Sequence, residues 1–230
     1  HMNISRKENM KKICGFLYKY RHAWLLSYAF IYLPWFMFLE RTVTRDYHIM
    51  HASLDDLIPF NEYFIVPYFL WFIYVAGTLI FFLFRSKEDY YKMCAFLFSG
   101  MTLSLIICTF FHNGTDFRPV SDPDKNIFSA AVAALYKTDT NTNVFPSIHV
   151  YNSVGTHIAI SRSRFLSKHK IIKLCSFLLT ASICLATMFL KQHSIIDVCG
   201  AFLMAYAIHY LVYGYAADTE DKKITEKALG

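Results

Sequence analysis

Apolar residues fall in long blocks along this chain, and five of the blocks are long enough to cross a membrane. A helix needs about 20 apolar residues to span the roughly 30 Å hydrocarbon core of a bilayer. The pattern therefore predicts transmembrane helices. The five blocks are residues 23–39, 63–84, 91–111, 171–190 and 194–217.

A sixth, shorter apolar block covers residues 147–160 and contains His149, Asn152 and His157. These polar residues are typical of a helix that faces other helices rather than lipid. Without this block, the basic segment 161–173 would share one side of the membrane with the polar segment 111–146. We therefore predict an all-α, polytopic membrane protein with six transmembrane helices in a bundle.

Charged residues make up only 17% of the chain, and their distribution predicts its orientation. Of the 23 Lys and Arg residues, 17 lie in the N-terminal segment, residues 85–92, residues 161–173 and the C-terminal tail. Because cytoplasmic segments are enriched in Lys and Arg, we expect both termini in the cytoplasm. Residues 40–62, 111–146 and 191–193 then face outward. The net charge of +6 follows from this topology and does not indicate nucleic-acid binding.

Several ionisable residues reach the outward ends of the predicted spans. An ionisable group inside a span costs about 2.5–3.5 kcal/mol, so Asp197 within the last span needs a role. His193 lies four residues earlier, and four residues separate neighbours on one helix face. A carboxylate that binds one imidazole nitrogen leaves the other free as a base or nucleophile. His149, near the outer end of the short block, joins this pair.

Three further residues on the same face suit phosphate binding. Ser147 follows Pro146 at the start of a span, where serine is a natural N-cap and the free helix amides favour an anion. Arg118 and Lys191 can supply positive charge to a phosphoryl group. The polar loop residues that we expect as contacts to a lipid headgroup are Asp55, Asp56, Asp116, Asn141 and Asn143.

These residues resemble three signatures of the type-2 phosphatidic acid phosphatase family. The K-x6-R-P signature reads from Phe111 to Pro119, with Arg118 kept and Phe111 in place of lysine. The P-S-G-H signature reads from Pro146 to His149, with isoleucine in place of glycine.

The third signature, S-R-x5-H-x3-D, keeps its histidine and aspartate and loses its serine–arginine pair, which Ala186 and Thr187 replace. Lys191, two residues before His193, is a candidate replacement for a missing cation. This local pattern is similar to the aureobasidin-resistance and sphingomyelin-synthase branch, whose members transfer lipid headgroups. The resemblance covers the six-span region from about Ala23 to Ala217.

The resemblance implies a role for each site residue. His193 attacks phosphorus and forms a phosphohistidine, Asp197 orients His193, and His149 protonates the leaving lipid oxygen. Positive charge and hydrogen bonds from Arg118, Lys191 and Ser147 hold the phosphoryl oxygens. The implied function is hydrolysis of a phosphatidate-like or polyprenyl phosphate or diphosphate at the outer membrane face, without a metal or other cofactor. A lipid phosphotransferase that moves a headgroup is the nearest alternative.

The sequence predicts three parts. In residues 1–22, Ile13, Phe16, Leu17 and Tyr20 recur at helical spacing among basic residues, which indicates an amphipathic interfacial helix on the cytoplasmic membrane surface; a solvated basic tail is the alternative. Residues 23–217 form the six-span catalytic domain, and residues 218–230 form a polar cytoplasmic tail. The partners expected are the bilayer and a membrane lipid phosphate, and the small size favours a bacterial plasma membrane. Aromatic residues near the span ends fit an interfacial belt, among them Trp24, Trp35, Tyr63 and Trp71.

The residue types alone leave three other interpretations open. Ser147, His193 and Asp197 could form a hydrolase triad, although Arg118 would then have no evident role. His149, His193 and Asp197 could bind a metal, although neighbouring cations disfavour one. A transporter or channel is disfavoured because the polar groups gather near one face and not at the bilayer centre.

Overall fold

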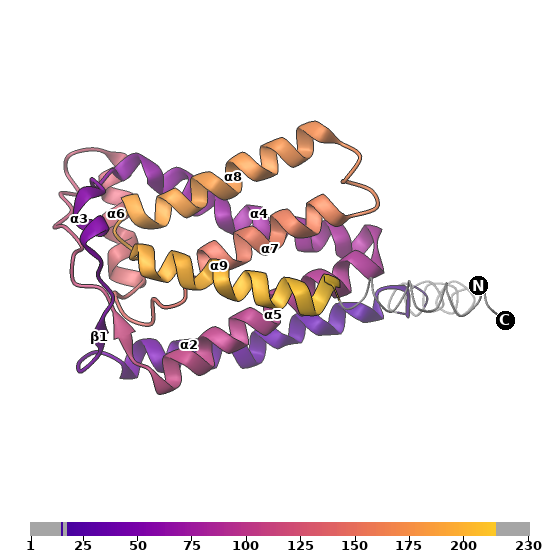
Figure 1. Ribbon diagram of the computed structural model, residues 1–230, viewed down its shortest axis with the longest axis horizontal. Coiled ribbons are helices and arrows are strands. Elements are labelled where there is room, and N and C mark those ends of the chain that lie inside the picture. Colours follow the sequence, from indigo (N-terminus) through magenta and orange to yellow (C-terminus); the bar gives the residue numbers. More distant parts are fainter. Residues whose placement is uncertain (1–14, 16–17, 215–230) are drawn as a thin grey trace, which may run out of the picture.

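The computed structural model describes residue 15 and residues 18–214, and these are mostly helical. Most of the predicted N-terminal amphipathic segment and the whole C-terminal tail lie outside the described residues. Figure 1 shows an elongated bundle whose helices run side by side. The helices of the bundle are η1 (Arg21–Tyr28) continuing into α2 (Ala29–Thr42), α4 (Ile65–Arg85), α5 (Lys87–Phe110), α7 (Ile148–Arg162), α8 (Lys170–Phe189) and α9 (Ile195–His209) continuing into η3 (Tyr210–Gly214).

Within the described residues, five helical segments are long and apolar enough to cross a membrane. They match the five long blocks of the sequence. Large apolar side chains cover their outer surface, and Phe30, Phe110 and Leu203 are 83%, 87% and 72% exposed. Because so extensive an apolar surface suits lipid and not water, the chain is an integral membrane protein. The segments are Arg21–Thr42, Glu62–Arg85, Lys87–Phe110, Lys170–Phe189 and Ile195–Gly214.

The helix α7 forms the centre of the bundle. It packs against α4, α5, α8 and α9, and it buries eight of its residues, including Asn152 and Thr156. The prediction that this segment faces other helices is therefore confirmed. Its 15 residues extend only about 22 Å, which is less than the hydrocarbon core, so a sixth span stays a prediction.

Glycine allows α5 and α7 to approach closely. A Cβ atom at Gly155 would lie 2.4 Å from the ring of Phe96, and one at Gly100 would lie 2.0 Å from the ring of Tyr151. The Tyr151 hydroxyl donates a hydrogen bond of 2.7 Å to the Phe96 carbonyl across the same contact. This packing places α7, and therefore His149, firmly in the bundle.

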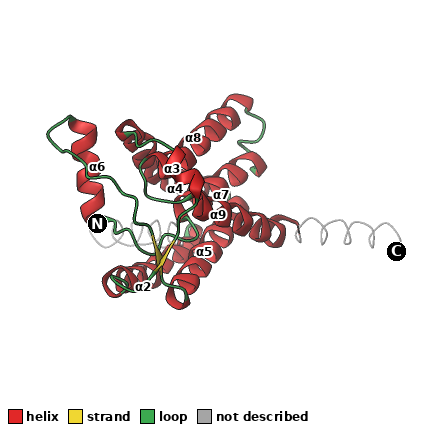
Figure 2. Cartoon of the chain, turned by 60° about the vertical axis from the view of Figure 1, so that its left-hand side comes forward, coloured by secondary structure: helices red, strands yellow, loops and turns green. Residues whose placement is uncertain are grey.

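One end of the bundle, here called the loop end, has structure that the sequence did not predict. Residues 111–146 were expected to form a loop, but they contain β2 (Asn113–Gly114) and α6 (Ile127–Thr138). The other long connection contains β1 (His48–Ile49), α3 (Ser53–Leu57) and η2 (Glu62–Phe64), and β1 pairs in parallel with β2. Figure 2 shows α6 beside the bundle, joined to it by long loops.

Candidate active site

His193 and Asp197 lie side by side at the turn between α8 and α9. Ser194 is the N-cap of α9, and its backbone N–H donates to Asp197 Oδ2 over 2.8 Å. This capping box holds the carboxylate 3.5 Å from His193 Nδ1. The predicted proximity is confirmed, but the predicted cause is wrong, because His193 precedes the helix and does not share a helical face with Asp197.

His149 approaches the same space from the first turn of α7. Its ring stacks on Tyr68 with 4.5 Å between centroids and packs against Trp71 at 4.4 Å. These aromatic contacts restrict the orientation of the imidazole. The centroids of the His149 and His193 rings are 6.0 Å apart. Trp71 therefore supports a site residue, whereas the sequence suggested only an interfacial belt.

Ser147 links these two helix starts. Its hydroxyl caps α7 by accepting a hydrogen bond from the Val150 N–H at 3.4 Å, which confirms the predicted N-cap. The Ser147 N–H donates to the Asp197 backbone carbonyl at 3.2 Å. The start of α7 is thus tied to the start of α9, which holds His149 near His193.

Arg118 reaches the site from the loop before α6. Its Nη1 donates to the Asp139 carbonyl and its Nη2 to the Thr140 carbonyl, each at 2.7 Å, and Nη2 also donates to Gln192 Oε1. Burial lowers the pKa of the Arg118 guanidinium, and the negative charge of Asp139 opposes this shift. Its Nε is buried and has no hydrogen-bond partner among the described residues. One donor of Arg118 is thus available to a bound anion.

Lys191 has a different environment from the one that the sequence suggested. Its Nζ donates to the backbone carbonyls of Asp55 at 2.6 Å and Ile58 at 2.5 Å. The residue is 9% exposed and adopts a left-handed backbone conformation, with φ of 53°. Lys191 therefore fastens α3 to the turn that holds His193, and it does not line the cavity described below.

Asp55 fastens the same turn from the other side. Its Oδ2 accepts hydrogen bonds from Ser194 Oγ at 2.5 Å and from Ala52 N at 2.8 Å, and its Oδ1 accepts from Ile195 N at 2.9 Å. The side chain is 3% exposed and does not line the cavity. In this position Asp55 holds the N-terminus of α9.

The remaining expected headgroup contacts separate into two groups. Asn143 lines the cavity. The exposed Asp56 pairs with His51 at 2.9 Å, Asp116 is also exposed, and Asn141 donates to the Thr115 carbonyl at 2.5 Å. These last three Asp and Asn residues do not line the cavity.

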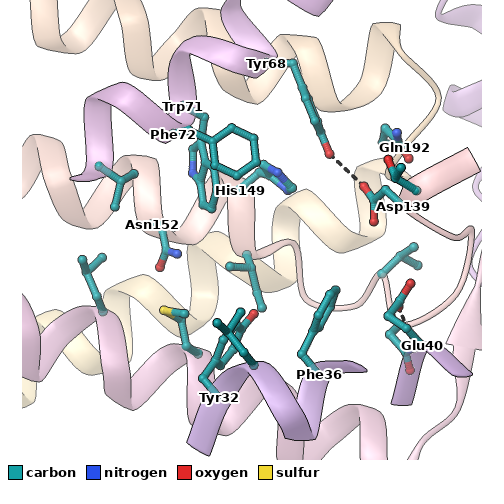
Figure 3. Close-up of a pocket in the computed structure, with 18 of the residues that line it drawn as sticks. Tyr32, Phe36, Glu40, Tyr68, Trp71, Phe72, Asp139, His149, Asn152 and Gln192 are labelled. Carbon is teal, nitrogen blue, oxygen red and sulfur yellow. Dashed lines mark hydrogen bonds between the residues drawn. The ribbon is translucent and has the colours of Figure 1, made fainter. Parts of the chain in front are cut away.

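His149 and His193 line a cavity of about 600 Å³ between α2, α4, α5 and α7. Figure 3 shows His149 between the polar residues Asp139 and Gln192 on one side and Asn152 on the other. A cavity that is polar at one end and apolar along its length suits an amphiphilic ligand. Its polar lining includes Glu40, Arg118, Asp139, Asn143, Gln192 and His193, and its apolar lining includes Tyr32, Phe36, Phe72, Val75, Leu97 and Met101.

Several of these cavity residues were not predicted from the sequence. Gln192 stands between Lys191 and His193, so its position beside the catalytic candidates was a usable signal. Asn152 lies three residues after His149, which places both on one face of a helix. Glu40 and Asp139 gave no such signal, because their place in the cavity depends on packing between distant segments. Among the described residues, no group of three His, Cys, Asp or Glu side chains could hold a metal ion.

Comparison with known proteins gives one family match. A family model described as PAP2 superfamily matches residues 90–220, which is more than half of the 230 residues. No curated protein and no solved structure gives a significant match. The matched range contains Arg118, Ser147, His149, His193 and Asp197, whereas α2 and α4 lie outside it.

Proposed function

The chain belongs to the PAP2 superfamily, and from this membership we propose that it hydrolyses the phosphate ester of a membrane lipid at the polar end of its cavity. Superfamily membership implies phosphatase or phosphotransferase-like chemistry on lipid phosphates. One observation carries the specific proposal. Two imidazoles, 6.0 Å apart, flank the polar end of an amphiphilic cavity, and one of them has a carboxylate 3.5 Å from its Nδ1.

In the proposed reaction His193 is the nucleophile. Asp197 lies beside Nδ1, so Nε2 is the nitrogen with a free lone pair. Attack by Nε2 forms a nitrogen–phosphorus bond while the bond from phosphorus to the lipid oxygen breaks, and that oxygen takes a proton from His149. His149 then accepts a proton from water, whose oxygen attacks phosphorus and releases inorganic phosphate and free His193.

Hydrogen-bond donors around the histidines support binding of the phosphoryl group. Arg118 Nε and Gln192 Nε2 are buried and have no partners among the described residues, and both residues line the cavity. We propose that they bind phosphoryl oxygens, together with the amides of the α7 N-terminus that Ser147 leaves free. Lys191 lies outside the cavity lining, where it adds positive charge near the site and positions the turn that holds His193.

We also propose that the loop end faces outward and that both termini are cytoplasmic, in a bacterial plasma membrane. The Lys and Arg distribution supports this orientation. Figure 1 is consistent with it, because η1 begins and η3 ends at the end of the bundle opposite the site.

Phosphate release tests the proposal. Purified protein in excess chelator is given phosphatidate and a polyprenyl phosphate, and released phosphate and the lipid products are both measured. We expect hydrolysis by the wild type and none by His193→Ala. The matched control is His209→Ala, because His209 lies at the other end of α9 and stacks on Tyr213. Full activity in His193→Ala would refute the assignment.

The charges in the cavity favour headgroup transfer as a second candidate function. Arg118 is the only Lys or Arg among the described residues that line the cavity, and the carboxylates of Glu40 and Asp139 line the same end. A phosphodiester with one negative charge suits this balance better than a phosphate monoester with nearly two. Supplying a phospholipid donor with diacylglycerol, ceramide or inositol tests this candidate, and a new phosphodiester product would favour transfer over hydrolysis.

A further inference from the structure

The cavity is open along one side, between α2 and α4. Both helices pack against α5, but they make little or no contact with each other. Figure 3 shows Tyr32 and Phe36 of α2 on one side of the cavity and Trp71 and Phe72 of α4 on the other. Phe72 lines the cavity and is nevertheless 55% exposed. The cavity therefore continues to the outer surface of the bundle.

An apolar stripe from each helix forms the edge of this opening. Leu26, Ala29 and Leu33 recur every three or four residues from the end of η1 into α2. Phe72 and Ala76 are four residues apart in α4 and so share one face of that helix. All of these residues line the cavity and are exposed. Each helix thus turns one apolar face toward the same gap.

The opening is about as deep as one leaflet of the bilayer. Glu40, at the polar end of the cavity, lies eleven residues after Ala29, or about 16.5 Å along the helix. Tyr68, whose hydroxyl donates to Asp139 at the same end, lies eight residues before Ala76, or about 12 Å. One leaflet contributes about 15 Å to the hydrocarbon core. The chain of a lipid whose phosphate lies at the polar end would therefore reach Ala29 and Ala76 near the bottom of that leaflet.

The medium around the opening identifies its occupant. Both η1 with α2 and α4 are long and apolar enough to span a membrane, so the gap between them lies in the hydrocarbon core, where lipid chains are the surroundings. A chain that enters from there does not cross water, where its apolar surface would be unfavourable in proportion to its area. The polar end is different, because α6 and the residue after it line the cavity there with Leu135 and Asp139.

We propose that the opening between α2 and α4 is a lateral portal that binds a lipid chain, and that Ala29 and Ala76 set the length of chain that the site accepts. A chain in the portal packs against Leu97 and Met101 of α5 on its inner side and meets bilayer lipid on its outer side. Methyl side chains at positions 29 and 76 leave room for this chain, and a large side chain at either position would block it. The inference rests on the proposed lipid phosphate site and adds the path of the chain and its length.

Two phosphatidates that differ only in chain length test the portal, one with hexanoyl chains and one with palmitoyl chains. We expect Ala76→Trp to lower kcat/KM for the palmitoyl lipid about tenfold relative to the hexanoyl lipid, the lower end of the discrimination that an apolar pocket achieves for one methylene group. Ala29→Trp, which fills the portal from the opposite helix, should have the same effect. Activity on the hexanoyl lipid shows in each case that the variant is folded.

Gly77→Trp is the matched control, because Gly77 is the next residue of α4, does not line the cavity and has nothing within 4 Å of an added Cβ atom. It should keep the wild-type ratio between the two lipids. Affinity for both lipids is measured in parallel in a His193→Ala background, where binding does not depend on turnover. If wild type released no phosphate but Ala76→Trp still weakened binding of the palmitoyl lipid alone, the portal would be supported and the proposed reaction refuted. An equal loss for both lipids in Ala76→Trp and Ala29→Trp, or a ratio changed no more than in Gly77→Trp, would overturn the inference.

Discussion

Asp55 offers a sharp test of how the site is held together. The structure predicts that Asp55→Asn destabilises the turn at His193, because the hydrogen bonds that the carboxylate accepts from Ala52, Ser194 and Ile195 join α3 to the start of α9. Asparagine has an NH2 group in place of one of the two carboxylate oxygens. In one orientation that NH2 faces the Ile195 N–H, and in the other it faces the Ala52 N–H and the Ser194 hydroxyl.

Both orientations leave a backbone N–H opposite another donor, and this sets the size of the effect. A hydrogen bond to a charged group contributes about 1.5–3 kcal/mol, so we expect Asp55→Asn to lose at least that much stability. The same change should shift His193, and a shift of about 1 Å at a catalytic group can cost about 100-fold in rate. We therefore expect kcat to fall more than KM rises.

The assay combines residual activity after heating in detergent with steady-state kinetics on the best lipid phosphate. Asp56→Asn is the control, because Asp56 is the adjacent residue of α3 and forms an exposed pair with His51. Such pairs contribute about 0–1 kcal/mol, so this variant should behave like wild type. If Asp55→Asn raised KM and left heat inactivation unchanged, Asp55 would be a headgroup contact and the structural reasoning would be refuted.

Two further predictions concern packing and charge. Gly155→Leu should destabilise the bundle by about 1–3 kcal/mol, because its side chain would overlap Phe96. Gly77→Leu is the control and should leave stability unchanged, because a Cβ atom at Gly77 meets nothing within 4 Å. The two variants are compared by thermal inactivation. Lys191→Met removes both hydrogen bonds of the ammonium group to backbone carbonyls, so it should lower heat stability and kcat with little change in KM. A large rise in KM alone would instead make Lys191 a direct phosphate ligand.

The sequence predicted the parts of the fold that depend on local composition. Long apolar blocks identify the spanning helices, because the hydrocarbon core requires them. The Pro146-Ser147 step identified the N-cap of α7, because a serine hydroxyl satisfies the free amides of a helix start. His193 and Asp197 could be paired because four residues separate them, although the capping box at Ser194 produces the contact.

The features that the sequence did not predict depend on contacts between distant segments. Asp55 binds Ser194 and Ile195, which lie 139 and 140 positions later, so no local pattern could assign its role. Lys191 donates to backbone carbonyl oxygens of Asp55 and Ile58. Every residue has such a carbonyl, so the amino-acid sequence could not identify these partners. The helix α6 has only 12 residues, which is too few for a membrane span. It was therefore predicted as part of a loop.

The lining of the cavity comes from two separate regions of the chain. Residues 90–220 supply Arg118 and both histidines, whereas α2 and α4, which end at Thr42 and Arg85, supply much of the apolar wall. Much of the apolar wall that would receive a lipid tail is thus encoded apart from the proposed catalytic residues, although α5 adds Leu97 and Met101 to that wall. If the proposed function holds, exchanging the stretch that contains α2 and α4 between related proteins would change the preference for the lipid tail. The proposed catalytic residues would stay the same.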